Sequence, residues 1–129
     1  MHYTSKVNEA AALTPKLYEK HSNGFRRVSY ADRLTGSVHM GTGICFLQAD
    51  GAVQQHIHSF EETFYILEGH ALVQIGDQAA MLGPGDFGLI GTGIRHAWRN
   101  TGAQPLRWLE MQAPQPRPVD AQAGRDTFF

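Results

Sequence analysis

The sequence has little cysteine, no long apolar run and, across its middle, no basic residue. Its 129 residues include one cysteine, Cys45, which cannot form an intramolecular disulfide and so fits a reducing compartment. No apolar stretch approaches the roughly 18 residues of a membrane span. The N-terminal run Ala10–Leu13 is too short for a signal-peptide core. These absences predict a cytoplasmic protein with no membrane partner.

Charge is sparse and unevenly placed. Charged residues make up 18% of the chain and the net charge is −1, so no bulk field attracts nucleic acid. Lys and Arg are absent from Leu34 to Ile94, where six acidic residues lie. These acids are Asp50, Glu61, Glu62, Glu68, Asp77 and Asp86. An acidic centre that also holds histidines suits a divalent cation, although a solvated acidic rim would give the same pattern.

Glycines and short β-type runs predict an all-β fold. The chain has 14 glycines, many of them in turns between apolar runs. Such spacing, with no helical pattern between the runs, favours an antiparallel sandwich or barrel. The expected strands cover 25–30, 37–48, 53–58, 62–68, 70–75, 78–82, 86–90, 95–100 and 105–112.

The two ends of the chain differ from this central pattern. Residues 1–24 lack periodicity and contain Pro15, which predicts an irregular arm with one short helical turn. Residues 25–113 form the expected barrel domain. Residues 114–129 are proline-rich and predict an extended arm rather than a strand. The closing pair Phe128–Phe129 can dock on the barrel or on a neighbouring subunit.

Histidines and a glutamate form the main chemical pattern. His56 and His58 lie two residues apart, so on a strand both imidazoles point to the same face. A short turn allows Glu62 to begin the next strand opposite them, and His96 follows another glycine turn. Neutral imidazoles with a carboxylate suit Mn, Fe, Co, Ni, Cu or Zn. Glu61 competes for the acidic position, but strand parity favours Glu62.

Two segments of the chain resemble the paired motifs of the cupin superfamily. The family patterns are G-x5-H-x-H-x3-4-E-x6-G and G-x5-P-x-G-x2-H-x3-N, and here they run from Gly51 to Gly69 and from Gly85 to Asn100. Four residues separate Gly51 from His56, where the family pattern has five, and Gly91 replaces the expected proline. Neither departure falls on a ligand position.

The resemblance implies a specific architecture and metal site. A small antiparallel double-stranded β-helix, or jelly-roll barrel, would hold one divalent metal ion on His56, His58, Glu62 and His96, and homodimers are frequent in the family. We expect Glu62 also to be a catalytic residue. His2, His21, His39 and His70 lie outside the motifs and are interpreted as surface or supporting residues.

Strand parity also predicts the lining of a pocket. Gln54 shares parity with His56, Trp98 shares it with His96, and Phe64 and Ile66 share it with Glu62. We expect these four to contact a small-molecule substrate or, for the aromatic rings, to be ordinary core. We expect Phe60 to lie at the mouth of this pocket. Cys45 is expected to be a core thiol, and Asn100 and Asp86 to hold turns.

The absence of basic residues from positions 34–94 narrows the class of substrate that the site can bind. Arg26 and Arg107 are the candidates for binding an anion, since Arg95 and Arg99 have the opposite parity to His96. A small molecule that chelates through enol, catechol-like or keto-acid oxygens therefore fits better than a phosphorylated sugar.

Three functions share this fold and ligand set. An oxygenase-type reaction, as in dioxygenases, comes first because such a metal leaves positions open for substrate and O₂. A non-redox isomerase or lyase is the second hypothesis, although Tyr65 stands one residue beyond the position of a base that some cupin lyases use. The third is a non-catalytic binding module.

Overall fold

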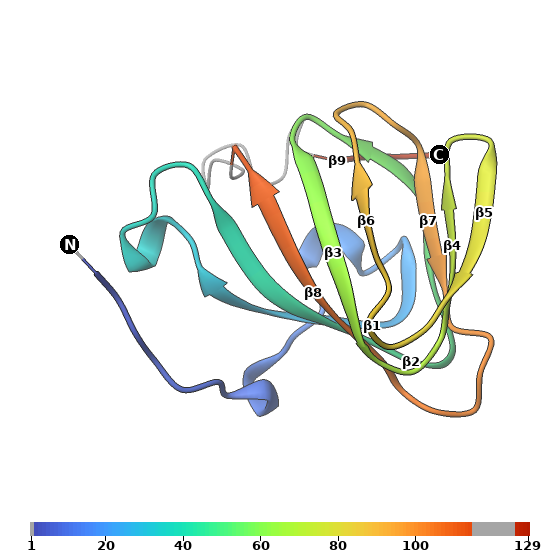
Figure 1. Ribbon diagram of the computed structural model, residues 1–129, viewed down its shortest axis with the longest axis horizontal. Coiled ribbons are helices and arrows are strands. Elements are labelled where there is room, and N and C mark those ends of the chain that lie inside the picture. Colours follow the sequence, from blue (N-terminus) through green and yellow to red (C-terminus); the bar gives the residue numbers. More distant parts are fainter. Residues whose placement is uncertain (1, 115–125) are drawn as a thin grey trace.

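The computed structural model describes residues 2–114 and 126–129, which form one antiparallel sheet curled into a nearly closed barrel (Figure 1). The strands are β1 (Ser22–Ala31), β2 (Gly41–His58), β3 (Glu61–Glu68), β4 (Ala71–Ile75), β5 (Gln78–Leu82), β6 (Phe87–Ile90), β7 (His96–Arg99), β8 (Leu106–Ala113) and β9 (Asp126–Phe128). The order across the sheet is β5-β4-β7-β2-β8-β3-β6, with β1 and β9 added to β2. The predicted all-β jelly-roll class is confirmed.

Strand β2 is the central element of the barrel. It runs unbroken for 18 residues and pairs with β1, β7, β8 and β9. The sequence predicted two separate strands here, 37–48 and 53–58, and this is wrong. Asp50 adopts a positive φ of 62° and only bends the strand. Strand β1 pairs with both sides of the bend, through a register shift between Asn23 and Phe25, and so holds the two halves together.

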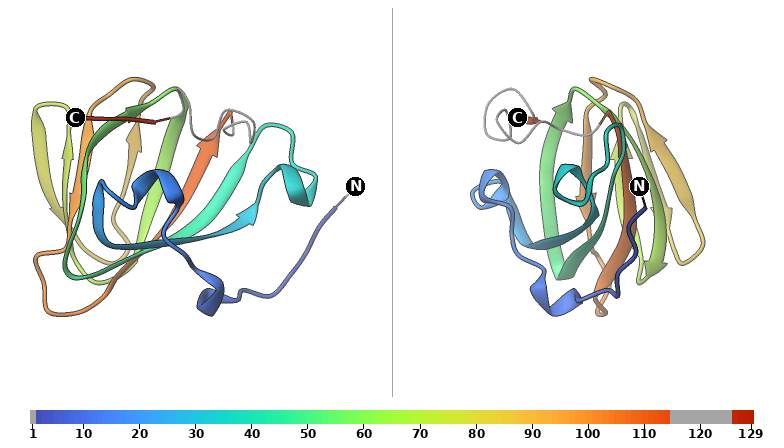
Figure 2. Two further views of the ribbon diagram at one scale, coloured as in Figure 1. Left: turned by 180° about the vertical axis from the view of Figure 1, so that it is seen from behind. Right: turned by 90° about the vertical axis from the view of Figure 1, so that its left-hand side faces the viewer.

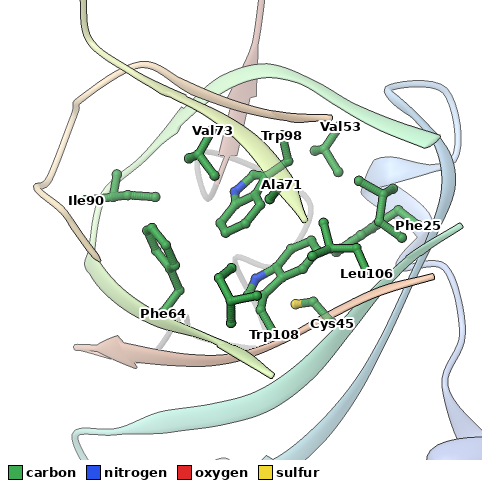
Figure 3. Packing of buried hydrophobic residues seen from close by; sticks show 12 residues of the cluster. Phe25, Cys45, Val53, Phe64, Ala71, Val73, Ile90, Trp98, Leu106 and Trp108 are labelled. Atoms are coloured by element: carbon green, nitrogen blue, oxygen red, sulfur yellow. The ribbon is translucent and has the colours of Figure 1, made fainter. Parts of the chain in front are cut away.

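The interior of the barrel changes from apolar to polar along the strands. On β8 the inward side chains are Leu106 and Trp108, followed by Glu110 and Gln112. The apolar end is filled by a cluster in which the indoles of Trp98 and Trp108 stack at 4.1 Å (Figure 3). Phe64 meets Trp98 edge-on at 4.8 Å. Close packing at this end supports the polar groups at the other end.

Both ends of the chain lie against the barrel. The N-terminal arm contains the 3₁₀ helices η1 (Glu9–Ala11) and η2 (Lys16–Tyr18), and a third, η3 (Arg33–Thr35), follows β1. Strand β9 pairs with His56–His58 of β2. Figure 2 shows the later part of the blue arm, just before β1, on the same side of the barrel as red β9.

The prediction that residues 114–129 form an extended arm is wrong at the C-terminal end of the segment. Residues 126–128 are a strand rather than an extended arm, because β2 offers them an unpaired edge beyond its contact with β1. Residues 115–125 of the predicted tail lie outside the described residues. No helix in the described ranges is long and apolar enough to cross a bilayer.

Candidate metal centre

Three histidines converge at the polar end of the barrel. His56 and His58 end β2, and His96 begins β7 opposite His56 in the register. Each offers one ring nitrogen, and these nitrogens all lie within 4.8 Å of one another. The three residues are 3%, 4% and 1% exposed, so water competes little for the nitrogens. This buried cluster can bind a metal ion.

The backbone orients all three rings. Nδ1 of His56, His58 and His96 lies 2.8, 2.8 and 2.9 Å from the carbonyl oxygens of Gln54, Phe60 and Ile94. A carbonyl can only accept, so each Nδ1 carries the proton and donates it. Each Nε2 therefore keeps its lone pair, which is the arrangement that metal-binding histidines show.

Burial keeps the imidazoles of His56 and His96 neutral. It lowers the pKa of His56, and burial together with neighbouring His56 lowers the pKa of His96 to about 3. A neutral imidazole is the form that ligates a metal. The cluster therefore fits a divalent ion in its three lone pairs, and His56 and His96 also fit it in their protonation state.

Glu62 lies beside the histidines but outside the three-nitrogen group. It is 4% exposed, and its Oε1 lies 3.7 Å from Nε2 of His58 and 3.4 Å from the amide of Gln112. Glu61 is exposed, as strand parity predicted. Burial, and then the neighbouring Glu110, raise the pKa of Glu62 well above its usual range. Its role as fourth ligand stays a prediction.

A buried polar network that sequence reasoning missed continues from Glu62. Glu110 accepts from Nε of Arg27 at 2.9 Å, from the amide of Gln112 at 2.8 Å and from the thiol of Cys45 at 3.5 Å. Burial alone would raise the pKa of Glu110, but the charge of Arg27 and hydrogen bonds with Glu62, Arg27 and Cys45 hold it below its usual value. The sequence did hold one signal for this network. Trp108, Glu110 and Gln112 are spaced two residues apart, so on a strand all three side chains face the same side.

The arginines proposed for an anionic substrate lie elsewhere. The Arg26 guanidinium lies over the ring of Phe46 at 5.1 Å, and Arg26 is exposed. Arg107 hydrogen-bonds to Glu68 and Glu9. Arg27 is the arginine whose guanidinium joins the interior network, and Glu110 already pairs with it.

Aromatic side chains cover the histidines. Phe60 stacks on His58 with centroids 4.0 Å apart. Phe128 of β9 lies 5.0 Å from the ring of His56 and stacks on His21 at 4.2 Å. The hydroxyl of Tyr18 lies 3.5 Å from Nε2 of His56. Burial and the nearby Asp126 raise the pKa of Tyr18, so its phenol stays protonated at neutral pH.

The four predicted pocket residues divide into two groups. Phe64, Ile66 and Trp98 are buried in the apolar cluster. Gln54 is exposed and binds His21 at 2.8 Å, so its predicted inward orientation is wrong. A register shift between Val53 and His56 changes the parity, and Val53 points inward instead. Gln112 is the amide that faces the interior.

Other predicted roles agree with the structure. Cys45 is fully buried, and burial raises the pKa of its thiol, as for a core cysteine. Asn100 donates to the carbonyls of Leu47 and Gln104 and accepts from the Gly102 amide. Asp86 accepts from the Gly83 amide at 2.8 Å. Both polar residues therefore hold turns.

Comparisons with solved structures show the same fold. The chain is similar to the polyketide cyclase RemF from Streptomyces resistomycificus, with a TM-score of 0.77, 19% identity, and 98% and 87% of the two chains covered. It is similar to a protein with a double-stranded β-helix domain from Klebsiella pneumoniae (TM-score 0.69, 14% identity, 98% and 97% covered). It is also similar to KdgF from Halomonas sp. (TM-score 0.66, 14% identity, 74% and 84% covered).

Sequence comparison defines the family. No curated protein matches the chain. The cupin domain family matches residues 43–112, which is more than half of the 129 residues and includes all three histidines and Glu62. The chain belongs to the cupin domain family.

Proposed function

We propose that this cupin is a metal-dependent enzyme that moves a proton on a small organic molecule bound through its oxygens. The observation that carries the proposal is the pairing of three oriented imidazoles with a buried carboxyl of raised pKa, 3.7 Å from one of them. Perturbed carboxyl groups beside a metal-binding set are typical of catalytic sites.

His56, His58 and His96 would hold the ion, with Glu62 as the fourth residue in reach. A bound divalent ion would supply Lewis acidity to a substrate oxygen. Glu62 would hold or take up the proton, because burial and the neighbouring Glu110 raise its pKa and so favour its protonated form. Gln112, which donates to both Glu62 and Glu110, would orient the carboxyl.

The surroundings of the histidines limit the substrate class. Phe60, Phe128 and Tyr18 present aromatic rings at this end of the barrel. In the described part of the chain no lysine is buried, and the interior Arg27 is paired with Glu110. A compact chelating molecule with an apolar body, such as an enol or keto acid, therefore suits the site better than a phosphorylated one.

An oxygenase-type reaction is the second candidate. Three imidazoles suit redox-active Fe, Mn, Ni or Cu as well as Zn, and leave coordination positions for substrate and O₂. The likeness to RemF and KdgF, at 19% and 14% identity, supports the fold and does not choose between the two.

The metal is tested by elemental analysis of protein purified without chelators. We expect about one equivalent per chain in the wild type and in His39→Ala, whose histidine is exposed. We expect loss of the metal with retained fold in His56→Ala and His96→Ala. Wild-type protein that cannot be loaded with Mn, Fe, Co, Ni, Cu or Zn would refute the proposal.

The chemistry is tested by screening enol, keto-acid and catechol substrates with and without O₂. Turnover by the Zn-loaded protein without O₂, lost in Glu62→Gln, would support proton transfer. O₂ uptake that requires a redox-active metal would favour the oxygenase.

We also propose that the protein is a cytoplasmic homodimer. Its single buried thiol supports the compartment, and the family resemblance supports the dimer.

A further inference from the structure

The cover above the three histidines comes from both ends of the chain. Tyr18 lies in η2 of the N-terminal arm, and Phe128 lies in β9. Their rings meet edge-on at 5.0 Å, and each also contacts the ring of His56, at 5.7 and 5.0 Å. Neither residue falls within the 43–112 range of the family match.

The hydroxyl of Tyr18 points at the metal-binding side of His56. It lies 3.5 Å from Nε2, the nitrogen whose lone pair faces the other two histidines, while Nδ1 on the far side binds Gln54. Two neighbours can accept the proton of this phenol, Nε2 of His56 and the Asp126 carboxylate, and an ion bound to His56 removes the first of them. The hydroxyl can then turn from Asp126 to an oxygen atom of a molecule bound beside His56.

Packing holds this hydroxyl in place. The ring centroids of Tyr18 and the core residue Phe25 lie 5.1 Å apart. The backbone carbonyl of Tyr18 accepts from the Ser22 hydroxyl at 2.7 Å. The backbone amide of Tyr18 donates to the carbonyl of Pro15 at 2.8 Å. Phe128 is itself fixed by β-pairing with His56 and by stacking on His21. Groups held this firmly can position a ligand without a large entropic cost.

We propose that Tyr18 is a substrate-binding residue of the metal centre, whose hydroxyl donates a hydrogen bond to an ionised oxygen of the bound organic molecule, and that Phe128 keeps it there. This inference rests on the proposed metal-dependent function. It identifies the ligand as a molecule with an enolate, phenolate or similar oxygen next to an apolar body, because the donor is a neutral phenol set among aromatic rings.

The test uses the full chain loaded with Co²⁺ and the coloured chelator 4-nitrocatechol. Wild-type protein binds Co²⁺ and shifts the nitrocatechol absorption. Tyr18→Phe removes one oxygen and keeps the ring, so it binds Co²⁺ in the same amount but 4-nitrocatechol at least about 10-fold more weakly, as expected for loss of a hydrogen bond to a charged oxygen. Tyr65→Phe, on an exposed face of β3, is the matched control and binds both normally.

Phe128→Ala is the second variant. It keeps the hydroxyl and removes the ring that packs on Tyr18, so we expect it to weaken 4-nitrocatechol binding without releasing Co²⁺.

Four other results would each contradict either the role of Tyr18 or the metal centre. Equal 4-nitrocatechol affinity in Tyr18→Phe and wild type removes Tyr18 from the binding site. Loss of Co²⁺ in Tyr18→Phe makes the residue part of the metal site itself and refutes the assigned role. Wild-type protein that binds Co²⁺ but not 4-nitrocatechol refutes this inference and leaves the metal centre standing. Failure of the wild type to bind Co²⁺ refutes the proposed function as well.

Discussion

Replacing Arg27 with methionine should be among the most destabilising single changes in the barrel. The side chains of Arg27 and Glu110 are 16% and 9% exposed, and Nε and Oε1 are 2.9 Å apart. Arg27→Met keeps the volume of the stem but leaves the Glu110 carboxylate buried with an amide and a thiol. Breaking such a pair from one side costs about 3–5 kcal/mol, against a total stability of about 5–15 kcal/mol.

The assay is urea unfolding at pH 7 with a chelator present, so that metal binding does not contribute. In a thermal scan the same loss would lower Tm by about 10–20 °C. Arg26→Met is the neighbouring control. Its guanidinium is exposed over the Phe46 ring, so removing it should cost no more than about 1 kcal/mol. The double variant Arg27→Met/Glu110→Met removes both charges and should recover about 2 kcal/mol relative to Arg27→Met alone.

The pair also has a pH signature. With Arg27 present, the lowered pKa of Glu110 adds stability above about pH 4.5 that is lost as the pH falls through the folded-state pKa. Without Arg27, burial raises the pKa of Glu110, and its contribution then grows as the pH falls. The reasoning is refuted if Arg27→Met costs no more than Arg26→Met, or if the effects of Arg27→Met and Glu110→Met simply add.

Three further predictions concern the histidines, the core and the assembly. Because burial lowers the pKa of His96 from 6.5 to about 3, the unfolded chain binds a proton in this window that the metal-free folded protein does not. The free energy of unfolding should therefore fall by about 1.4 kcal/mol for each pH unit as the pH drops from 6.5, with a shallower slope in His96→Ala. Gly88→Ala should cost about 1–3 kcal/mol in urea unfolding, because its Cβ would lie 2.5 Å from Cζ of the buried Phe64. Gly91→Ala, with 3.5 Å to Ile94, should be near neutral, and equal costs would contradict the packing argument. Sedimentation velocity should give twice the 14.3 kDa chain mass, and a single-chain mass would exclude the homodimer.

The residues that sequence reasoning placed correctly share one property: local spacing determines them. His56 and His58 face one side because strand side chains alternate. Glu62 is buried and Glu61 exposed for the same reason. Glycine turns between short apolar runs were sufficient to predict an antiparallel sandwich or barrel, and the resemblance to the cupin motifs selected the barrel.

The residues that were missed or misplaced depend on information that spacing does not carry. Gln54 was misplaced because a register shift of β2 lies between Val53 and His56, and a shift of one residue exchanges the two faces. The Arg27–Glu110 pair joins residues 83 positions apart, which only the strand register brings together. Tyr18 and Phe128 belong to segments without a repeating pattern, so nothing local indicated that they meet over His56.

The pairing of β2 with four strands, from β1 to β9, has a consequence for folding order. Contacts between distant segments make such barrels slow to fold, in about milliseconds to seconds. On a ribosome, which releases the N-terminal residues first, His56, His58 and His96 emerge well before Phe128. Until β9 pairs with β2, the ring of Phe128 is absent from His56, and an ion can reach the three imidazoles through that uncovered side.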